Sequence, residues 1–292
     1  MPSTRDIRRR IRSVRNTAQI TKAMEMVAAA KMRKAQQAAL AGRPYAALMN
    51  QVLAEVTTHA RDFQHPLLEE RDETQRCLIV VGTDKGLCGS LNSNLLREAG
   101  RANRETTLYI TAGRKASQFV ARTKRRLAAE FTYKDAPLFS EARAISKFAQ
   151  DLFLKGEVGR VDILFTAFIS TLVQKPETVP LLPVGQITGV TAGISSRGTE
   201  QPLAGGATEY LFEPSAGQVL GALLPHYLNF KVYQILLEAK ASEQSSRMVA
   251  MKNATDNAKQ LIKDLTLDYN KLRQANITKE LLEIASAAMA VG

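Results

Sequence analysis

A repeat of mostly apolar residues, spaced alternately four and three positions apart, opens the chain and restricts what it can fold into. Eight of its ten positions are apolar: Ile7, Ile11, Val14, Ala18, Thr21, Glu25, Ala28, Met32, Ala35 and Ala39. This spacing is typical of a coiled-coil seam. We therefore expect one long helix that starts at Ser3 or Thr4, continues past Gly42 and Pro44 with at most a kink, and ends near Thr57.

The same spacing returns near the other end of the chain. Seven of eight positions are apolar there: Met251, Ala254, Ala258, Leu261, Leu265, Asp268, Leu272 and Ala275. A second long helix is expected to begin after the Glu213-Pro214-Ser215 turn and to run to about Met289, with a kink at Pro225 in an early turn. An ordinary bundle core would need several further helices of this length, and the sequence offers none. The two helices are therefore expected to form an antiparallel coiled coil.

The middle of the chain has a different texture, in which short β-rich runs alternate with amphipathic stretches. The expected strands are residues 77–81, 108–111, 161–169 and 209–213, and the expected helices are 91–101 and 138–154. This alternation predicts a three-layer α/β domain with a largely parallel sheet. Residues 189–206 are rich in Gly and Ser and are expected to form a surface loop.

The fold class predicted from these patterns is α/β, with a Rossmann-like domain inserted between the two long helices. The expected boundaries are 1–57 for the N-terminal coiled-coil helix, 74–213 for the α/β domain and 214–292 for the C-terminal helix.

Positive charge is concentrated at the start of the chain. Residues 1–43 contain eleven Lys or Arg against only Asp6 and Glu25, and so supply +9 of the net charge of +12. An acidic partner is expected near this segment, which can be nucleic acid, an anionic membrane surface or an acidic protein. No apolar run approaches the roughly 18 residues of a membrane-spanning helix, and the start does not read as a signal peptide. A soluble chain of the cytoplasmic type is expected.

One glycine-rich segment, residues 82–90, follows a predicted strand at a place where nucleotide loops often occur. It has only Gly86 and Gly89 in a Gly-x-x-Gly spacing, and matches neither the phosphate-binding loop nor the dinucleotide fingerprint. A tight structural turn is favoured over a nucleotide site. The alternative, a nucleotide-dependent α/β enzyme with helical extensions, would need a phosphate loop that the sequence does not show.

The residues that could carry metal or nucleophilic chemistry are few and scattered. Cys77 and Cys88 match neither a disulfide framework nor a zinc site. The histidines, His59, His65 and His226, have no metal-ligand spacing. No catalytic residues, cofactor or metal are therefore expected.

Three segments carry a family resemblance. The first is Ile7-Arg8-Arg9-Arg10-Ile11-Arg12-Ser13-Val14-Arg15-Asn16-Thr17, continued at 20–29 and 31–35; the second is Asp84-Lys85-Gly86-Leu87-Cys88-Gly89 with Leu91-Asn92; the third is Arg247-Met248-Val249-Ala250-Met251-Lys252-Asn253-Ala254-Thr255-Asp256-Asn257-Ala258. Together with Ile277, Thr278, Glu280 and Glu283, they resemble the gamma subunits of F-type ATP synthases. The chain departs from the family pattern at two places, Ser90 and the pair Ser286-Ala287, where the family usually has glycines.

The resemblance implies a role for particular residues. Contacts with a catalytic β subunit are implied for Lys22, Met24, Arg247, Gln274, Thr278 and Glu280. A position near a foot on the membrane-embedded c ring is implied for Tyr210, Phe212 and Glu213. If Met24 lies opposite Arg247, Ile7 is expected near Asp264, and residues 269–292 extend beyond the N-terminal helix.

The resemblance also implies a noncatalytic subunit of the proton-transporting ATP synthase. The expected partners are the α and β subunits of the hexameric ring, the epsilon subunit and the c ring, with no nucleic acid and no cofactor. The expected role is a central rotor shaft that couples proton flow to ATP synthesis and regulates ATPase activity, peripherally attached at the cytoplasmic face of the bacterial inner membrane. A basic coiled-coil protein that binds nucleic acid is the alternative, which accounts for the charge but not for the apolar overhang.

Overall fold

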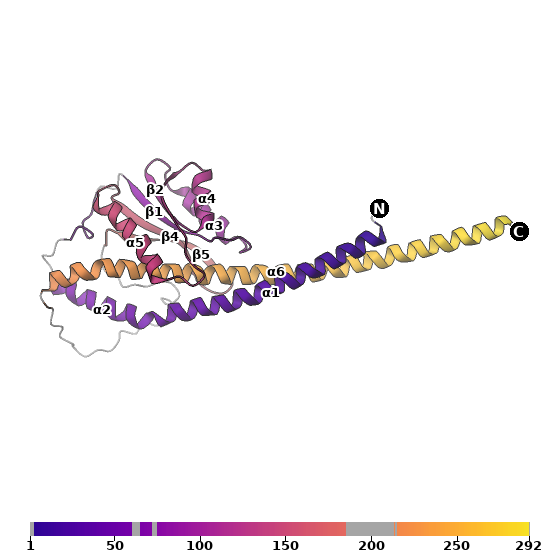
Figure 1. Ribbon diagram of the computed structural model, residues 1–292, viewed down its shortest axis with the longest axis horizontal. Coiled ribbons are helices and arrows are strands. Elements are labelled where there is room, and N and C mark those ends of the chain that lie inside the picture. Colours follow the sequence, from indigo (N-terminus) through magenta and orange to yellow (C-terminus); the bar gives the residue numbers. More distant parts are fainter. Residues whose placement is uncertain (1–2, 60–64, 72–74, 185–212, 214, 292) are drawn as a thin grey trace. The chain divides into compact units, whose positions relative to one another are not determined.

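The computed structural model describes residues 3–59, 65–71, 75–184, 213 and 215–291, with only the backbone at 43, 54, 55, 57–59 and 287–291. The chain divides into two compact units. The first consists of residues 1–27 and 248–292, and is called here the helical hairpin. The second consists of residues 28–247, and is called here the α/β unit. Helices α1 (Thr4–Ala41) and α6 (Ala216–Val291) each contribute to both units (Figure 1).

A five-stranded sheet forms the centre of the α/β unit. Its strands are β1 (Arg76–Val81), β2 (Thr107–Ala112), β3 (Arg126–Phe131), β4 (Arg160–Phe168) and β5 (Gln174–Leu182). They lie in the order β3-β2-β1-β4-β5; β1 is parallel to β2 and β4, β2 is parallel to β3, and only β5 is antiparallel to its neighbour. The predicted α/β class and largely parallel sheet are confirmed.

Helices cover both faces of this sheet, which explains why its central strands are apolar without alternation. In β1, Leu78 and Val80 pack with α3 (Leu91–Arg101) and α4 (Arg114–Arg122). On the opposite face of β1, Cys77, Ile79 and Val81 join a larger core. That core includes residues of α2 (Arg43–His59), α5 (Phe139–Leu154) and α6 (Figure 1).

The N-terminal helical region is interrupted at Gly42. Helix α1 ends at Ala41, Gly42 forms a turn, and α2 begins at Arg43, so the single helix expected through this point is two helices. A Cβ at this position would lie 2.2 Å from the amide nitrogen of Gln234 of α6, so that flexible side chain would have to turn away. Pro44 lies in the first turn of α2, where a helix tolerates its missing N–H. Pro225 lies inside α6, which continues past it.

The helical hairpin consists of the start of α1 and the C-terminal part of α6, in antiparallel order. The Thr21 and Thr255 hydroxyls are buried and lie 2.7 Å apart, and Arg8 contacts Tyr269 by a hydrogen bond and a cation–π contact. Pairing therefore extends to Tyr269, and the expected position of Ile7 near Asp264 is wrong. The hydroxyl pair fixes a register that apolar spacing alone does not specify.

The predicted seam of α1 is confirmed over its ten positions, all of which are buried or half-buried. The predicted seam of α6 is correct only in part. Leu261, Asp268 and Ala275 are exposed, while Ile262 and Tyr269 are half-buried instead. A straight helix has 3.6 residues per turn, so its buried face drifts away from a strict alternation of three and four.

Candidate partner-binding surfaces

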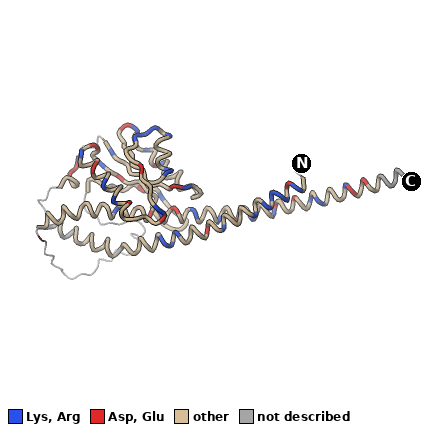
Figure 2. The backbone as a smooth tube through the Cα atoms, in the orientation of Figure 1, with Lys and Arg blue, Asp and Glu red and all other residues tan. Residues whose placement is uncertain are grey.

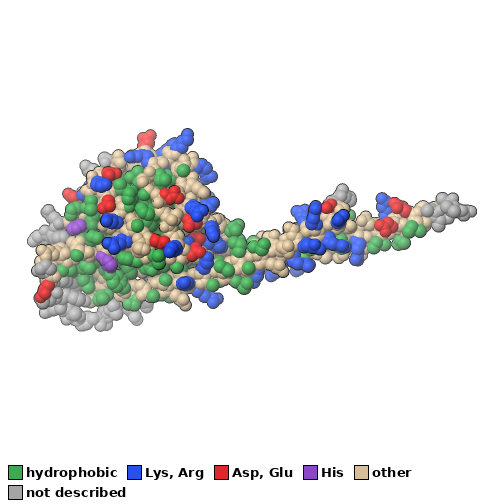
Figure 3. Space-filling model, viewed as in Figure 1, with side chains coloured by type: hydrophobic (Ala, Val, Ile, Leu, Met, Phe, Trp, Pro, Cys, Tyr) green, Lys and Arg blue, Asp and Glu red, His purple; other side chains and the backbone are tan. Residues whose placement is uncertain are grey.

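The last described side chains of α6 form a segment that the helical hairpin leaves uncovered. Every residue from 273 to 286, called here the tip, is exposed. Its large apolar side chains are 49 to 67% exposed: Ile277, Leu281, Leu282 and Ile284. Figure 3 shows apolar side chains beside charged ones on this end of the helix. The overhang predicted from residue 269 is therefore present, but starts four residues later.

Three of the predicted β-subunit contacts lie on the tip. Gln274 and Glu280 are exposed, and the Thr278 hydroxyl donates a 3.0 Å hydrogen bond to the Gln274 carbonyl of its own helix. The side chains of Gln274 and Glu280 are thus accessible to a partner along one segment of helix.

Lys22 and Met24 lie on α1 within the helical hairpin. The Lys22 ammonium is 3.0 Å from the Glu25 carboxylate, and Met24 is half-buried. The neighbouring Met26 and Val27 are more than half exposed. Figure 2 shows that the basic residues gather toward the N-terminal end of α1, as the charge count predicts. This helix therefore offers both positive charge and apolar surface.

Arg247 lies in the α/β unit and makes its hydrogen bonds within the chain. Its guanidinium is 2.7 Å from the Glu243 carboxylate and also donates to the carbonyls of Lys85 and Gly86, at 3.4 and 3.3 Å. Its contact with a partner stays a prediction, and holding the glycine-rich loop is an additional role that the sequence did not indicate.

The glycine-rich loop itself is a tight turn fastened to α6. Leu87 and Gly89 both have positive φ, 61° and 59°, and the Ser246 hydroxyl donates to the Cys88 carbonyl at 2.7 Å. Several of its carbonyl oxygens thus point at α6, and carbonyl oxygens repel phosphate. The geometry supports the structural turn rather than a nucleotide site.

The two thiols are buried and poorly suited to nucleophilic chemistry. Burial raises the pKa of the Cys77 thiol to about 12, with a further contribution from the Asp162 carboxylate. Burial also raises the pKa of the Cys88 thiol, against the opposing effect of Arg247. A higher pKa leaves less thiolate, which is the reactive form.

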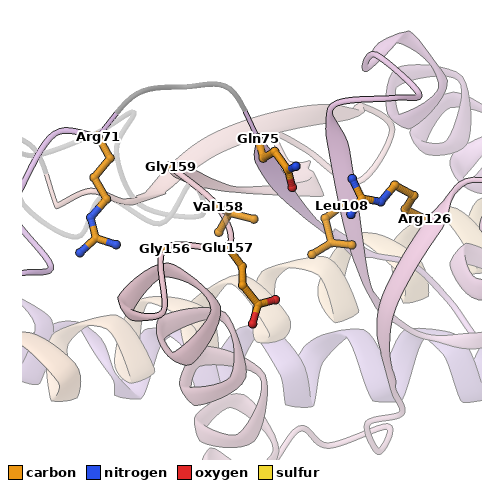
Figure 4. A pocket seen from close by; sticks show the side chains of 8 residues that line it. All are labelled: Arg71, Gln75, Leu108, Arg126, Gly156, Glu157, Val158 and Gly159. Atoms are coloured by element: carbon orange, nitrogen blue, oxygen red, sulfur yellow. The ribbon is translucent and has the colours of Figure 1, made fainter.

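A surface cavity of about 550 Å³ lies at the amino ends of the strands (Figure 4). Its lining comprises Arg71, Gln75, Leu108, Arg126, Gly156, Glu157, Val158 and Gly159. Arg71 already donates to the Phe153 carbonyl and stacks on the Phe153 ring. Ligands of open α/β sheets bind at the opposite, carboxyl edge. The cavity therefore supports no nucleotide-binding assignment.

Other predicted features are placed only in part. Glu213 is exposed, whereas Tyr210, Phe212, the 189–206 loop and most of the 209–213 strand lie outside the described residues. Among the described residues, no three His, Cys, Asp or Glu side chains gather as metal ligands. No helix within the described ranges is long and apolar enough to cross a bilayer.

The fold and the uncovered tip define a long-helix α/β subunit, and a family model described as ATP synthase matches residues 3–291. The ATP synthase gamma chain of Opitutus terrae is 50% identical over 99% of both chains. That of Methylacidiphilum infernorum is 45% identical over the full length of both. The chain belongs to the ATP synthase gamma chain family, and so is a component of the ATP synthase complex.

Solved structures agree with this assignment. The central stalk and c-ring structure of the Tetrahymena thermophila mitochondrial ATP synthase contains a chain 27% identical to this one, with a TM-score of 0.61, matching 80% of this chain and 99% of that chain. A chain of the Euglena gracilis enzyme, at 20% identity and a TM-score of 0.66, matches 99% of this chain and 94% of its own length. The Euglena likeness confirms the fold.

Proposed function

We propose that the chain is the central rotor shaft of an F-type ATP synthase, coupling proton flow through the c ring to ATP synthesis or hydrolysis in the α/β hexamer. The exposed tip carries this proposal. Burying apolar surface is favourable by about 25 cal/mol per Å². A helix end with four large apolar side chains in water therefore favours a partner that encloses it.

A hydrophobic sleeve at the top of a ring of α and β subunits is such a partner. One asymmetric shaft inside three copies of a catalytic site contacts each copy differently, and so favours a different conformation in each. Rotation moves these preferences around the ring. The related structures are of a central stalk with its c ring and of F1 with its c ring, which supports the α/β hexamer and the c ring as partners. The epsilon subunit is proposed as a further partner.

The residue roles follow from the same proposal. The tip residues Gln274, Thr278 and Glu280 contact β subunits, and so do Lys22 and Met24 on α1 and Arg247 on α6. Tyr210, Phe212 and Glu213 form the foot near the c ring. The division into 1–57, 74–213 and 214–292 separates shaft helix, α/β domain and shaft helix with tip.

Catalysis and location complete the proposal. The chain has no catalytic centre of its own, which the fastened glycine-rich loop and the buried thiols support, and it regulates the ATPase activity of its neighbours. It sits at the cytoplasmic face of the bacterial inner membrane through the complex. Family membership does not support the alternative of a nucleic-acid-binding protein.

Truncation of α6 tests the proposal. Removing residues 273–292 deletes the uncovered tip and leaves the Thr21–Thr255 and Arg8–Tyr269 contacts. The isolated chain should lose only the helical circular-dichroism signal of the deleted residues and keep its unfolding midpoint, while the reconstituted complex should lose ATP-driven proton pumping. Removing only 286–292 is the matched control, and should leave most pumping intact. Full pumping by the longer truncation would contradict the rotor-shaft proposal.

A further inference from the structure

A stretch of α6 in the α/β unit is polar and yet buried. Residues 238–247 are called here the polar segment. Six of its side chains are no more than 3% exposed: Glu238, Lys240, Ser242, Glu243, Gln244 and Ser245. Burying polar and charged groups costs free energy unless each finds a partner. The partners of this segment therefore show what it holds together.

The end of β4 and the following turn provide the first partners. The Phe168 backbone N–H donates to the Glu238 carboxylate at 3.0 Å. The Ser245 hydroxyl donates to the Thr171 carbonyl at 2.8 Å. These two bonds attach α6 to the carboxyl edge of the sheet at points two helical turns apart.

The glycine-rich loop after β1 provides the second set of partners, and it is held by the two residues of α6 that follow Ser245. The Ser246 hydroxyl and the Arg247 guanidinium donate to carbonyls of the glycine-rich loop, at Cys88 and Gly86. Because β1 and β4 are neighbours in the sheet, both loops contact the same short stretch of helix.

Charged side chains provide the third set of partners, which links the polar segment to α1. The Lys240 ammonium is 2.9 Å from the Glu243 carboxylate and 3.4 Å from that of Asp135, and it lies over the Tyr133 ring. The Asp135 carboxylate is also 2.5 Å from the Lys31 ammonium of α1. A chain of opposite charges thus joins α1, the loop before α5 and α6.

Stability alone does not explain these buried charges, because well-packed apolar residues of similar volume are often as stable or more so. Apolar contacts are also non-directional. Hydrogen bonds and ion pairs restrict both distance and angle, so they fix how far a helix is turned about its own axis. The polar segment is suited to setting that angle.

We infer that Lys240 and Glu243 are positioning residues that fix the rotational angle of α6 relative to the sheet of the α/β unit. Torque can then pass between the sheet and the helix without the helix turning about its own axis. This inference rests on the proposed rotor function and adds residues to it that the family comparison does not name. The apolar core of the unit holds α6 against the sheet, and the polar segment holds its rotational angle.

The test is the double variant Lys240→Met/Glu243→Gln, assembled with the other subunits into the complete ATP synthase. Both buried charges leave together, and the amide oxygen introduced by Glu243→Gln can still accept from Arg247, so the isolated chain should unfold near the wild-type midpoint. Protons pumped per ATP hydrolysed should fall at least about two-fold, the lower end of effects seen when coupled networks are mutated. ATP hydrolysis should persist. Unchanged pumping per ATP would overturn the inference.

Two further variants and a control make the result specific. Glu98→Gln/Arg101→Met removes an exposed ion pair from α3 and should change nothing. Lys240→Arg keeps the cation and should retain pumping. If the double variant fails to fold, Ser245→Ala/Ser246→Ala decides, because it removes two helix-to-loop hydrogen bonds and no charge. Pumping at the wild-type ratio by the serine variant would then overturn the inference, whereas a wild-type complex that cannot pump would contradict the rotor function itself.

Discussion

Two stretches of α6 both depart from the usual burial pattern of a soluble helix, one by burying polar side chains and the other by exposing apolar ones. The polar segment, 238–247, buries charges and hydroxyls, whereas the tip, 273–286, exposes large aliphatic side chains. A soluble helix normally buries its apolar stripe and exposes its charges. The polar segment is matched to loops of its own chain, whereas the tip has no such neighbour among the described residues and is left for the partner proposed above.

Thiol labelling should reveal the largest difference between the two stretches. Cys88 lies in the loop held by the polar segment, while Leu282→Cys places a thiol on the tip, where Leu282 is 62% exposed. If opening of the loop costs about 4 kcal/mol, labelling of Cys88 should be roughly a thousand-fold slower. Its raised pKa slows it further.

The labelling rates can be followed with an aromatic disulfide reagent at pH 8. Cys77 is also buried, so wild-type protein supplies the background rate for both native thiols. In denaturant all three thiols of the variant should react at similar rates. Comparable rates for Cys88 and the introduced tip thiol without denaturant would show that the loop is not held by α6.

Removing one charge from each stretch should give the next largest difference. Lys240→Met leaves the buried Glu243 carboxylate with Arg247 alone, and should lower the free energy of unfolding by about 3 kcal/mol. On the tip, Lys279 and Glu283 form an exposed pair at 3.7 Å. Lys279→Met should change the free energy of unfolding by no more than about 0.5 kcal/mol.

Urea unfolding of the isolated chain, followed by circular dichroism, measures both values. The m-value should stay constant across wild type and the two variants, since the same surface becomes exposed. Equal effects of the two substitutions would remove the distinction between the buried and the exposed stretch.

Much of the fold could be predicted because periodicity reports how many faces of an element are buried. The ten-position seam of α1 and the continuous apolar runs of β1, β2 and β4 identified these elements. Strands β3 and β5 and helix α4 were missed. Most of β3 and β5 is exposed or half-buried, and β5 contains Pro176 and Pro180. Edge strands of this kind lack the apolar signal on which the prediction depends.

The sequence predicted the tip, whose exposure depends only on the lengths of the two helices. It did not predict the polar segment, whose burial depends on residues distant in sequence. The tip follows from counting helix lengths, although the true register moved its start past Tyr269. The polar segment gave no such signal, because Lys240 and Glu243 have the spacing of an ordinary solvated helix pair. Only the positions of Asp135 and the loops show that these charges are buried.

A further buried polar residue of α6, Thr255, extends the comparison to the helical hairpin. The Thr21 and Thr255 hydroxyls lie 2.7 Å apart, so one donates to the other, and the accepting hydroxyl donates to a carbonyl of its own helix, that of Ala18 for Thr21 or that of Met251 for Thr255. Thr255→Val should therefore cost only about 1 kcal/mol of unfolding free energy. The double variant Thr21→Val/Thr255→Val should cost less than the sum of the costs of Thr21→Val and Thr255→Val measured singly. Strict additivity in urea unfolding would show that the two hydroxyls do not interact.

The smallest expected effect concerns Asp135, the partner of the polar segment that stays partly exposed. The hydrogen bond from Lys31, with the nearby Lys240, holds the pKa of its carboxyl below the ordinary value of 3.8. A depressed folded-state pKa adds stability above pH 3.8, and this contribution is lost as the pH falls through the folded-state value. Asp135→Asn should therefore be less stable than wild type at pH 6, and the difference should shrink toward pH 3. Asp256→Asn, in an exposed pair with Lys259, is the control and should show little difference at either pH. A difference for Asp135→Asn that is the same at both pH values, measured by urea unfolding, would show that this carboxylate contributes nothing as a charge to the joint between α1 and α6.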